Sequence, residues 1–168
     1  VCPVSTGLIV KSLAASYIEF EIDIWAIIPN NRHHGHKKIG LSNARGGYLM
    51  PELDFVNSKA VLANDHVFLQ GQTGLTLDGK GFIGEGDPAK QAENAMQNVK
   101  MLLEAVGANL ADICKVTTYI TNPSFRDLVY PVLAKNLKGV IPVSTGTVVK
   151  SLGRPELDFE IDIFAMIP

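Results

Sequence analysis

Hydrophobic and polar positions alternate in two stretches near the middle of the chain. Residues 56–63 and 67–72 are apolar, β-rich runs, and Asn64 and Asp65 lie between them. This residue pair suits a tight turn between antiparallel strands. The pattern therefore predicts a β-hairpin.

The next pattern has helical spacing. Apolar residues recur three and four positions apart at Ala92, Ala95, Met96, Val99, Leu102, Leu103 and Val106. Asp87 suits the N-cap, Pro88 the first turn and Gly107 the stop. We expect an amphipathic helix that lies on a sheet, with its methionines in the core.

The remaining patterns complete a module. Residues 113–120 predict a strand, and residues 124–137 predict a second helix that Pro131 interrupts or kinks. Residues 141–150 and 157–167 predict two closing strands. The order β-β-α-β-α-β-β indicates an α+β fold with both helices on one face of a mixed sheet.

An internal repeat dominates the organisation of the chain. Residues 3–29 and 142–168 are identical at most positions, at a constant offset. Their separation is that of a whole domain rather than of a solenoid unit. We predict that residues 1–29 are the C-terminal strand pair of a preceding module, that residues 30–40 are a linker, and that residues 41–168 are a complete module.

The predicted linker is polar and holds His33, His34 and His36. An adventitious metal site and a solvated linker are both compatible with this cluster. The solvated linker is favoured because the cluster contains no carboxylate or thiol. We therefore expect no metal or other cofactor.

Composition narrows the function classes. The 168 residues are 46% hydrophobic and 19% charged, with a net charge of -2. Without a run of about 18 apolar residues the chain is not expected to span a membrane, and nucleic acid is an improbable partner for a surface that is not basic. Two cysteines fit a reduced, cytoplasmic setting, with Cys114 in the core of its strand.

The last predicted strand carries a row of carboxylates. Asp158, Glu160 and Asp162 alternate with apolar residues, so they project from one face of the strand. Like charges about 7 Å apart raise one another's pKa. One carboxylate could act as a general acid or base on water, and a solvated face or a salt-bridged subunit contact is the alternative.

Ser144 and Thr145 open the preceding strand. The module histidine outside the linker, His66, lies in the hairpin, so a Ser-His-Asp triad has little support. The two hydroxyls are candidates to bind a carboxylate or oxyanion. Ordinary strand propensity explains them equally well.

Several segments together resemble one family, the YjgF/YER057c/UK114 family, also called RidA or Rid, whose members are often labelled L-PSP endoribonucleases. The resembling segments are residues 58–61, 67–72, 91–107, 116–121, 142–145 and 159–162. The resemblance covers nearly the whole predicted module. It implies a chorismate-mutase-like fold, a homotrimer, and ligand clefts between subunits.

The resemblance also implies chemistry. The best-known activity of the family is hydrolysis of reactive enamines and imines to keto acids and ammonia. Glu160 matches the family's water-orienting glutamate. Val143 stands where the family has its substrate-binding arginine, and Asn57 stands near the place of the family's cleft tyrosine. A valine cannot supply the two charge-assisted hydrogen bonds of an arginine fork, so Arg154 and Arg126 are the candidates to replace it.

Three functions follow as hypotheses. The first is an enamine or imine deaminase, with Glu160 activating water and with Ser144, Thr145 and the Gly71 backbone holding a small ligand. The second is a non-catalytic trimeric protein that binds a small ligand or a partner, which Val143 favours. The third is an endoribonuclease, which the acidic strand and the lack of a basic, aromatic surface disfavour.

Overall fold

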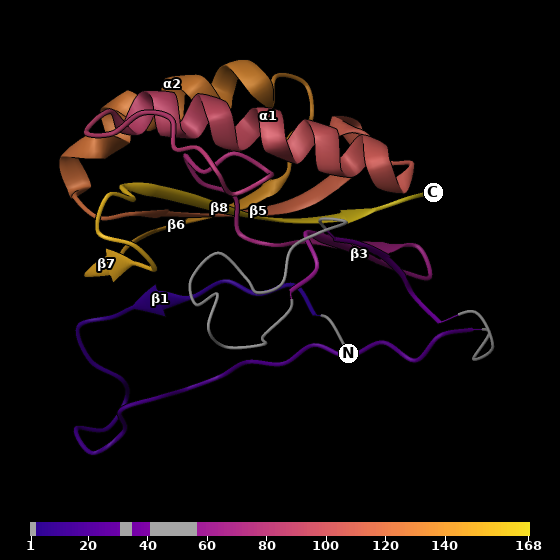
Figure 1. The fold of residues 1–168 in the computed structure, drawn as a ribbon, viewed down its shortest axis with the longest axis horizontal. Helices are drawn as coiled ribbons and strands as arrows, with labels where there is room; N and C mark the ends of the chain where they lie inside the picture. The colour runs from indigo at the N-terminus through magenta and orange to yellow at the C-terminus, as the bar shows by residue number, and fades with distance from the viewer. Residues whose placement is uncertain (1–2, 31–34, 41–56) are drawn as a thin grey trace.

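The computed structural model describes residues 3–30, 35–40 and 57–168. Its main element is a six-stranded mixed sheet (Figure 1). In spatial order the strands are β2 (Lys37–Ile39), β3 (Ala60–Ala63), β4 (His66–Leu69), β8 (Phe159–Met166), β5 (Ile113–Ile120) and β6 (Val143–Val148). The β5–β6 pair is parallel, and the other pairs are antiparallel.

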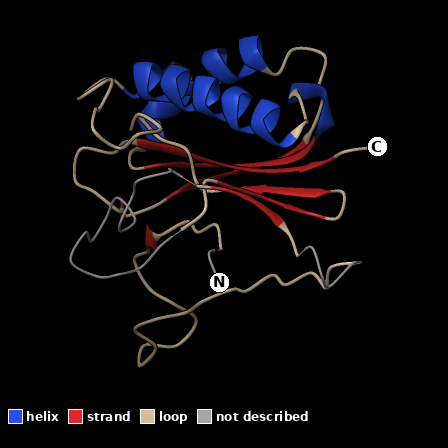
Figure 2. Cartoon of the chain, turned by 45° about the vertical axis from the view of Figure 1, so that its right-hand side comes forward, coloured by secondary structure: helices blue, strands red, loops and turns tan. Residues whose placement is uncertain are grey.

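Two helices cover one face of this sheet. α1 (Pro88–Val106) and α2 (Arg126–Asn136) lie side by side above the strands in both views (Figures 1 and 2). Short 3-10 helices span Leu110–Asp112 and Pro123–Phe125. The predicted α+β fold, with its helices on one face of a mixed sheet, is confirmed.

Local chemistry places α1 where the pattern predicted it. The Asp87 side chain accepts a hydrogen bond from the Lys90 amide, and Pro88 opens the first turn. Gly107 ends the helix with a φ of 91°, a left-handed conformation that glycine adopts without a Cβ clash. The methionine prediction is half wrong, because Met96 is buried but Met101 is 49% exposed on the outer side of the helix.

The hydrophobic core lies between the helices and the sheet. Phe159, Ile161 and Ile163 project from the central strand β8 toward the helices and are almost fully buried. Met96 and Leu103 of α1 belong to the same cluster. Because alternate residues of β8 are committed to this core, the residues between them face the other side of the sheet. We call that other side the open face.

Several element boundaries differ from the predictions. The strand predicted from residue 56 begins at Ala60 in β3, and the last predicted helix divides into a 3-10 turn and α2, which contains Pro131. The predicted strand 141–150 is followed by a separate short strand, β7 (Ser151–Leu152).

The prediction for Cys114 is wrong. Its side chain is exposed rather than in the core. The pairing of β5 with β8 shifts register between Ile113 and Lys115, so Cys114 is the extra residue of a β-bulge. A bulge reverses the inward and outward alternation locally, which a period-two pattern does not reveal.

The N-terminal repeat lies across the open face, opposite the helices (Figure 1). Within residues 3–30 the assigned strand is β1 (Leu8–Ile9), which pairs antiparallel with β7. The second strand expected in this segment is not assigned among the described residues. The large apolar side chains of residues 17–28 are instead solvent-exposed: Tyr17, Phe20, Ile22, Ile24, Trp25 and Ile28.

The predicted linker is partly structured. Residues 37–39 form β2, which pairs with β3 at the edge of the sheet. His36 Nε2 lies 2.7 Å from the carbonyl oxygen of Ile27. His33 and His34 lie outside the described residues, as do positions 41–56 of the predicted module.

In the described ranges, neither helix combines the length and apolar character that crossing a membrane requires.

Candidate active site

Glu160 is the central residue of the candidate site. Strand alternation places it on the open face, between the core residues Phe159 and Ile161. Although it faces away from the helices, Glu160 is only 6% exposed. A carboxyl group that is this deeply buried is unusual and calls for a structural cause.

The cause is a close approach of the chain at Gly71. A Cβ atom at position 71 would overlap Glu160 Oε1 and would lie 2.8 Å from the Thr6 hydroxyl oxygen. Two backbone hydrogen bonds between Gln72 and Ile161, each 2.9 Å, hold this loop against β8. Glycine at position 71 therefore leaves space for the Glu160 carboxyl group, which would have to shift if a Cβ were present.

Asp162 lies two residues further along β8 and has two hydroxyl partners. The Thr6 hydroxyl donates to Oδ1 over 2.5 Å, and the Tyr119 hydroxyl donates to Oδ2 over 3.0 Å. These bonds favour the charged form of Asp162, whereas burial raises its pKa, and the net direction is upward. Asp162 thus links the N-terminal repeat to the sheet.

Burial raises the pKa of Glu160 to about 8, and the negative charge of Asp162 adds to this effect. Near neutral pH the Glu160 carboxyl group is therefore mostly protonated. A buried, protonated carboxyl group can donate a proton to a bound ligand and then accept one from water. This is the property that general acid–base chemistry requires.

A small cleft opens beside Glu160. Its walls include Ser5 and Gly7 of the N-terminal repeat, together with Lys59 and Gly71. The cleft measures about 70 Å³, which is more than the roughly 10–15 Å³ that a single water molecule needs. The arrangement therefore suits a small metabolite.

Lys59 brings a cationic group to this cleft. It precedes β3 and is 8% exposed, and its ammonium group donates a hydrogen bond of 2.7 Å to Gln70 Oε1. Burial lowers the pKa of Lys59 to about 7. The amine is thus charged below neutral pH and increasingly uncharged above it.

The structure brings together only some of the predicted site residues. Gly71 lines the cleft with Glu160. Asn57 lies beside the N-terminal repeat, where its side-chain amide donates a hydrogen bond of 3.1 Å to the Ser5 hydroxyl. Val143, Ser144 and Thr145 lie apart from the cleft, on the exposed edge strand β6.

The sheet register explains this separation. Thr145 of β6 is opposite Thr117 of β5, and Thr117 is opposite Asp162 of β8. One full strand therefore lies between the predicted hydroxyl pair and the acidic row. The serine and threonine of the other repeat lie nearer: the Thr6 hydroxyl donates to Asp162, and Ser5 lines the cleft.

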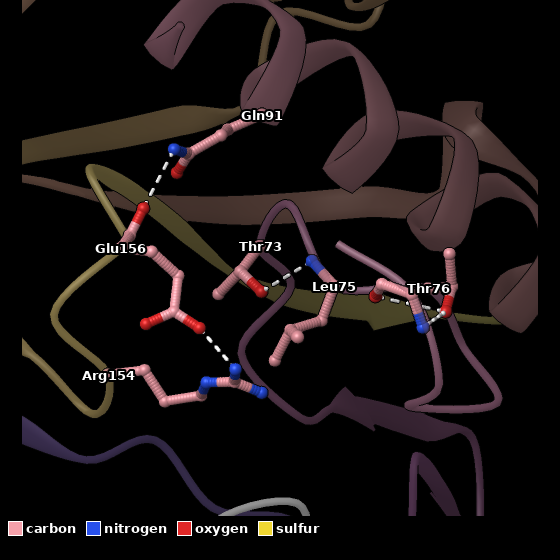
Figure 3. Close-up of polar contacts among 7 residues, drawn as sticks. Thr73, Leu75, Thr76, Gln91, Arg154 and Glu156 are labelled. Atoms are coloured by element: carbon pink, nitrogen blue, oxygen red, sulfur yellow. Dashed lines mark hydrogen bonds and ion pairs between the residues drawn. The ribbon is translucent and has the colours of Figure 1, made fainter. Parts of the chain in front are cut away.

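The two arginines proposed as anion anchors have other partners. The Arg154 guanidinium group pairs with the Glu156 carboxylate, and the Glu156 carbonyl accepts a hydrogen bond of 3.1 Å from the Gln91 amide (Figure 3). Arg126 lies over the ring of Tyr130, 5.4 Å from its centroid. Neither arginine lines the Glu160 cleft.

Sequence reasoning missed Lys59, Thr6 and Tyr119. A lysine beside a strand is ordinarily solvated, and a tyrosine in a strand is ordinarily part of a packed surface. The repeat was a usable signal for Thr6, because position 6 corresponds to Thr145.

The described residues contain no group of three His, Cys, Asp or Glu side chains that could hold a metal ion.

Comparisons with known proteins identify the family. Residues 51–167 match the model of the family described as Endoribonuclease L-PSP. The chain belongs to this family. It is 31% identical to the RutC family protein YjgH of Escherichia coli over 113 residues, which is 66% of this chain and 82% of that protein.

Other relatives match over shorter stretches. A protein named 2-iminobutanoate/2-iminopropanoate deaminase from Dermatophagoides farinae is 32% identical over 75 residues, covering 42% of this chain and 58% of that protein. The chain aligns with 49% of the length of each of two RutC family proteins from Pyrococcus species.

A solved structure has the same fold. Rv2704 of Mycobacterium tuberculosis, described as a member of the YjgF/YER057c/UK114 family, superposes with a TM-score of 0.64 at 25% identity. The superposition covers 79% of this chain and all of that chain. The resemblance drawn from the sequence segments is therefore confirmed.

Proposed function

We propose that this protein hydrolyses the C=N bond of a small imine, or of its enamine tautomer, and releases ammonia and a carbonyl product. The observation that carries the proposal is Glu160, a buried and mostly protonated carboxyl group beside a cleft of metabolite size. The similarity to a protein named as a 2-iminobutanoate/2-iminopropanoate deaminase supports the same chemistry.

A single carboxyl group, that of Glu160, can donate and accept all the protons that this reaction transfers. The Glu160 carboxyl group donates its proton to the imine nitrogen, and the resulting carboxylate accepts a proton from the water that adds to the carbon. In the second step the group again protonates the nitrogen, ammonia leaves, and the carboxylate accepts the hydroxyl proton as the C=O bond forms. Glu160 ends in its starting state.

Lys59 is our candidate for the substrate's anion anchor. Lys59 lines the same cleft, and its ammonium group is charged below a pKa of about 7. A charge-assisted hydrogen bond from an ammonium group to the substrate carboxylate supplies part of the binding energy that Val143 cannot supply. Lysine lacks the bidentate geometry of arginine, so we propose that the acid group of the substrate is held by a single ammonium contact rather than by two parallel hydrogen bonds.

A non-catalytic, small-ligand-binding protein is the second candidate. The observations that favour it are Val143, which is 67% exposed at the sheet edge, and Arg154, which is engaged by Glu156. Both leave the cleft without an arginine. The endoribonuclease activity that the family description names is the weakest candidate, because neither Arg126 nor Arg154 lines the cleft to bind a phosphate group.

The proposal is tested by following ammonia release from freshly generated 2-iminobutyrate and 2-aminoacrylate. Wild type, Glu160→Gln and the control Glu156→Gln are compared with the spontaneous rate. We expect acceleration by wild type and by the control, and none by Glu160→Gln. A wild-type rate equal to the spontaneous rate would reject the reaction on these substrates and favour the binding protein.

A further inference from the structure

Lys59 lies in a setting that is unusual for a lysine. The residue is 8% exposed, although lysines are almost always found on the protein surface. Its backbone is held on both sides. The Lys59 amide donates a hydrogen bond of 2.7 Å to the Ile39 carbonyl, and the Lys59 carbonyl accepts one of 2.9 Å from the Gln70 amide. The place of Lys59 in the cleft wall is therefore fixed by backbone bonds to both neighbouring segments.

The hydrogen bond of the Lys59 side chain is compatible with nucleophilic chemistry. Nζ donates 2.7 Å to Gln70 Oε1, and both residues line the Glu160 cleft. This bond uses an N–H and not the nitrogen lone pair, which is the pair that an amine nucleophile uses. Burial lowers the pKa of Lys59 to about 7, so at pH 8 about 90% of the amine is uncharged, against less than about 1% for a lysine with the ordinary value of 10.5.

Glu160 supplies an acid in the same cleft. Among the described residues that line the cleft, Lys59 and Glu160 are the two titratable side chains. The pKa of Glu160 is raised by burial to about 8, above that of Lys59. Between these two values most of the amine is uncharged and most of the carboxyl group is protonated. Imine formation needs this combination, because the amine attacks a carbonyl carbon and an acid assists the departure of the oxygen as water.

We infer that Lys59 is a covalent binding site for a small carbonyl compound, with which its amine forms an imine. The class includes the 2-oxo acids that the proposed hydrolysis would release. The inference goes beyond that hydrolysis, because imine formation at Lys59 does not require ammonia to be released. The protonated amine is the anion anchor proposed above, and the uncharged amine is the nucleophile.

The reaction balances without an oxidant or a reductant. The Nζ lone pair forms the C–N bond, the π pair of the C=O bond moves to oxygen, and one proton passes from nitrogen to that oxygen. Glu160 then protonates the resulting hydroxyl group, the C–O bond breaks, water leaves, and the nitrogen lone pair forms the C=N bond. The iminium group returns its proton to the Glu160 carboxylate, so the products are the imine and water.

The test treats the full chain with pyruvate and sodium cyanoborohydride at pH 8. The hydride reduces an imine to a stable secondary amine, and peptide mapping by mass spectrometry then locates the label. We expect Lys59 to be labelled at least roughly tenfold faster than Lys80, an exposed lysine, because a larger fraction of its amine is uncharged. The inference is overturned if Lys59 is labelled no faster than Lys80.

Variants at two glutamates test the acid. Glu160→Gln should slow labelling of Lys59 roughly tenfold or more and leave labelling of Lys80 unchanged, because the variant lacks the proton donor for the loss of water. Glu156→Gln is the matched control and should be labelled like wild type. Equal labelling of Lys59 in both variants would overturn the assignment of Glu160 as the acid of this step.

Ammonia release from 2-iminobutyrate in the same preparations separates this inference from the proposed hydrolysis. A Lys59 label without ammonia release supports the covalent site and rejects the hydrolysis, whereas ammonia release without a Lys59 label does the reverse. Lys59→Met should lose the label at position 59 and retain the slow label at Lys80. Lys59→Arg keeps a cation and should lose the same label, because a guanidinium group stays protonated and forms no imine.

Discussion

The Tyr119 hydroxyl donates a hydrogen bond of 3.0 Å to Asp162, across the β5–β8 pair. This contact holds the Asp162 carboxyl group in place. Burial is the larger cause of the raised pKa of Glu160, and the negative charge of Asp162 is the second cause. Burial, the Asp162 charge and the hydrogen bond also raise the pKa of Tyr119, which keeps its hydroxyl a donor throughout the accessible pH range. The acidity of Glu160 therefore depends on a neighbour held in place by other residues.

Replacing Asp162 by asparagine should lower the pKa of Glu160. The shift is partial, because burial is the larger cause and remains. The general acid would then lose its proton at lower pH, so the alkaline fall of ammonia release moves toward neutral pH. Asp158→Asn is the matched control, since Asp158 lies on the same strand and accepts a hydrogen bond from Thr121. An unchanged pH profile in Asp162→Asn would show that Asp162 does not influence the group.

Replacing Glu160 by glutamine should stabilise the protein at neutral pH while removing activity. The folded pKa of about 8 lies above the ordinary value of 4.5, so the protonated carboxyl group favours folding fully below pH 4.5. That contribution is lost as pH rises to about 8. At 1.36 kcal/mol per pKa unit, glutamine gains at most about 3 kcal/mol over wild type at pH 7.

Urea unfolding of both proteins at pH 4 and at pH 7 checks this prediction. The stability difference should be small at pH 4 and should favour the variant at pH 7. A difference that does not change with pH would mean that Glu160 titrates normally in the folded protein.

Replacing Lys59 by methionine should weaken binding of an anionic substrate. Loss of a charge-assisted hydrogen bond worth about 1.5–3 kcal/mol raises KM roughly 10- to 100-fold, with a smaller effect on kcat. In wild type, KM should also rise as pH passes the Lys59 pKa of about 7, and this step should be absent in the variant. Lys80→Met, on the exposed glycine-rich loop, is the control. Equal KM values for wild type and Lys59→Met would exclude this anchor.

The repeat allows a paired gain-of-function experiment. Val4 and Val143 are equivalent positions, and Val4 lies two residues from Thr6. Val4→Arg should lower KM for carboxylate-bearing imines roughly tenfold, because it adds a guanidinium group to the segment whose residues Ser5 and Gly7 line the cleft. Val143→Arg should have no effect in monomeric chains. If Val143→Arg lowers KM and Val4→Arg does not, a neighbouring chain rather than the first repeat completes the cleft.

The sequence predicted the fold well because strong periodicity and matching caps coincide. Asp87, Pro88 and Gly107 bound α1 where the apolar spacing begins and ends, and residues 113–120 form β5 as expected. Cys114 was misplaced because a bulge changes alternation without a clear residue signature.

The site was less predictable because its residues meet through tertiary contacts. Glu160 and Gly71 were identified from the sequence, but the burial of Glu160 depends on a loop that pairs with Ile161. Lys59 gave no pattern of its own. The repeat was evident, yet its sequence alone does not say that residues 3–9 lie across the sheet of their own chain.

The pH dependence of ammonia release, with Glu160→Gln as reference, tests the central claim most directly. The account predicts that the wild-type rate falls as pH rises through about 8, because Glu160 loses the proton that it donates. It also predicts that Glu160→Gln shows neither the acceleration nor this fall. Acceleration that persists in Glu160→Gln with the same pH profile would contradict the assignment of Glu160 as the catalytic acid.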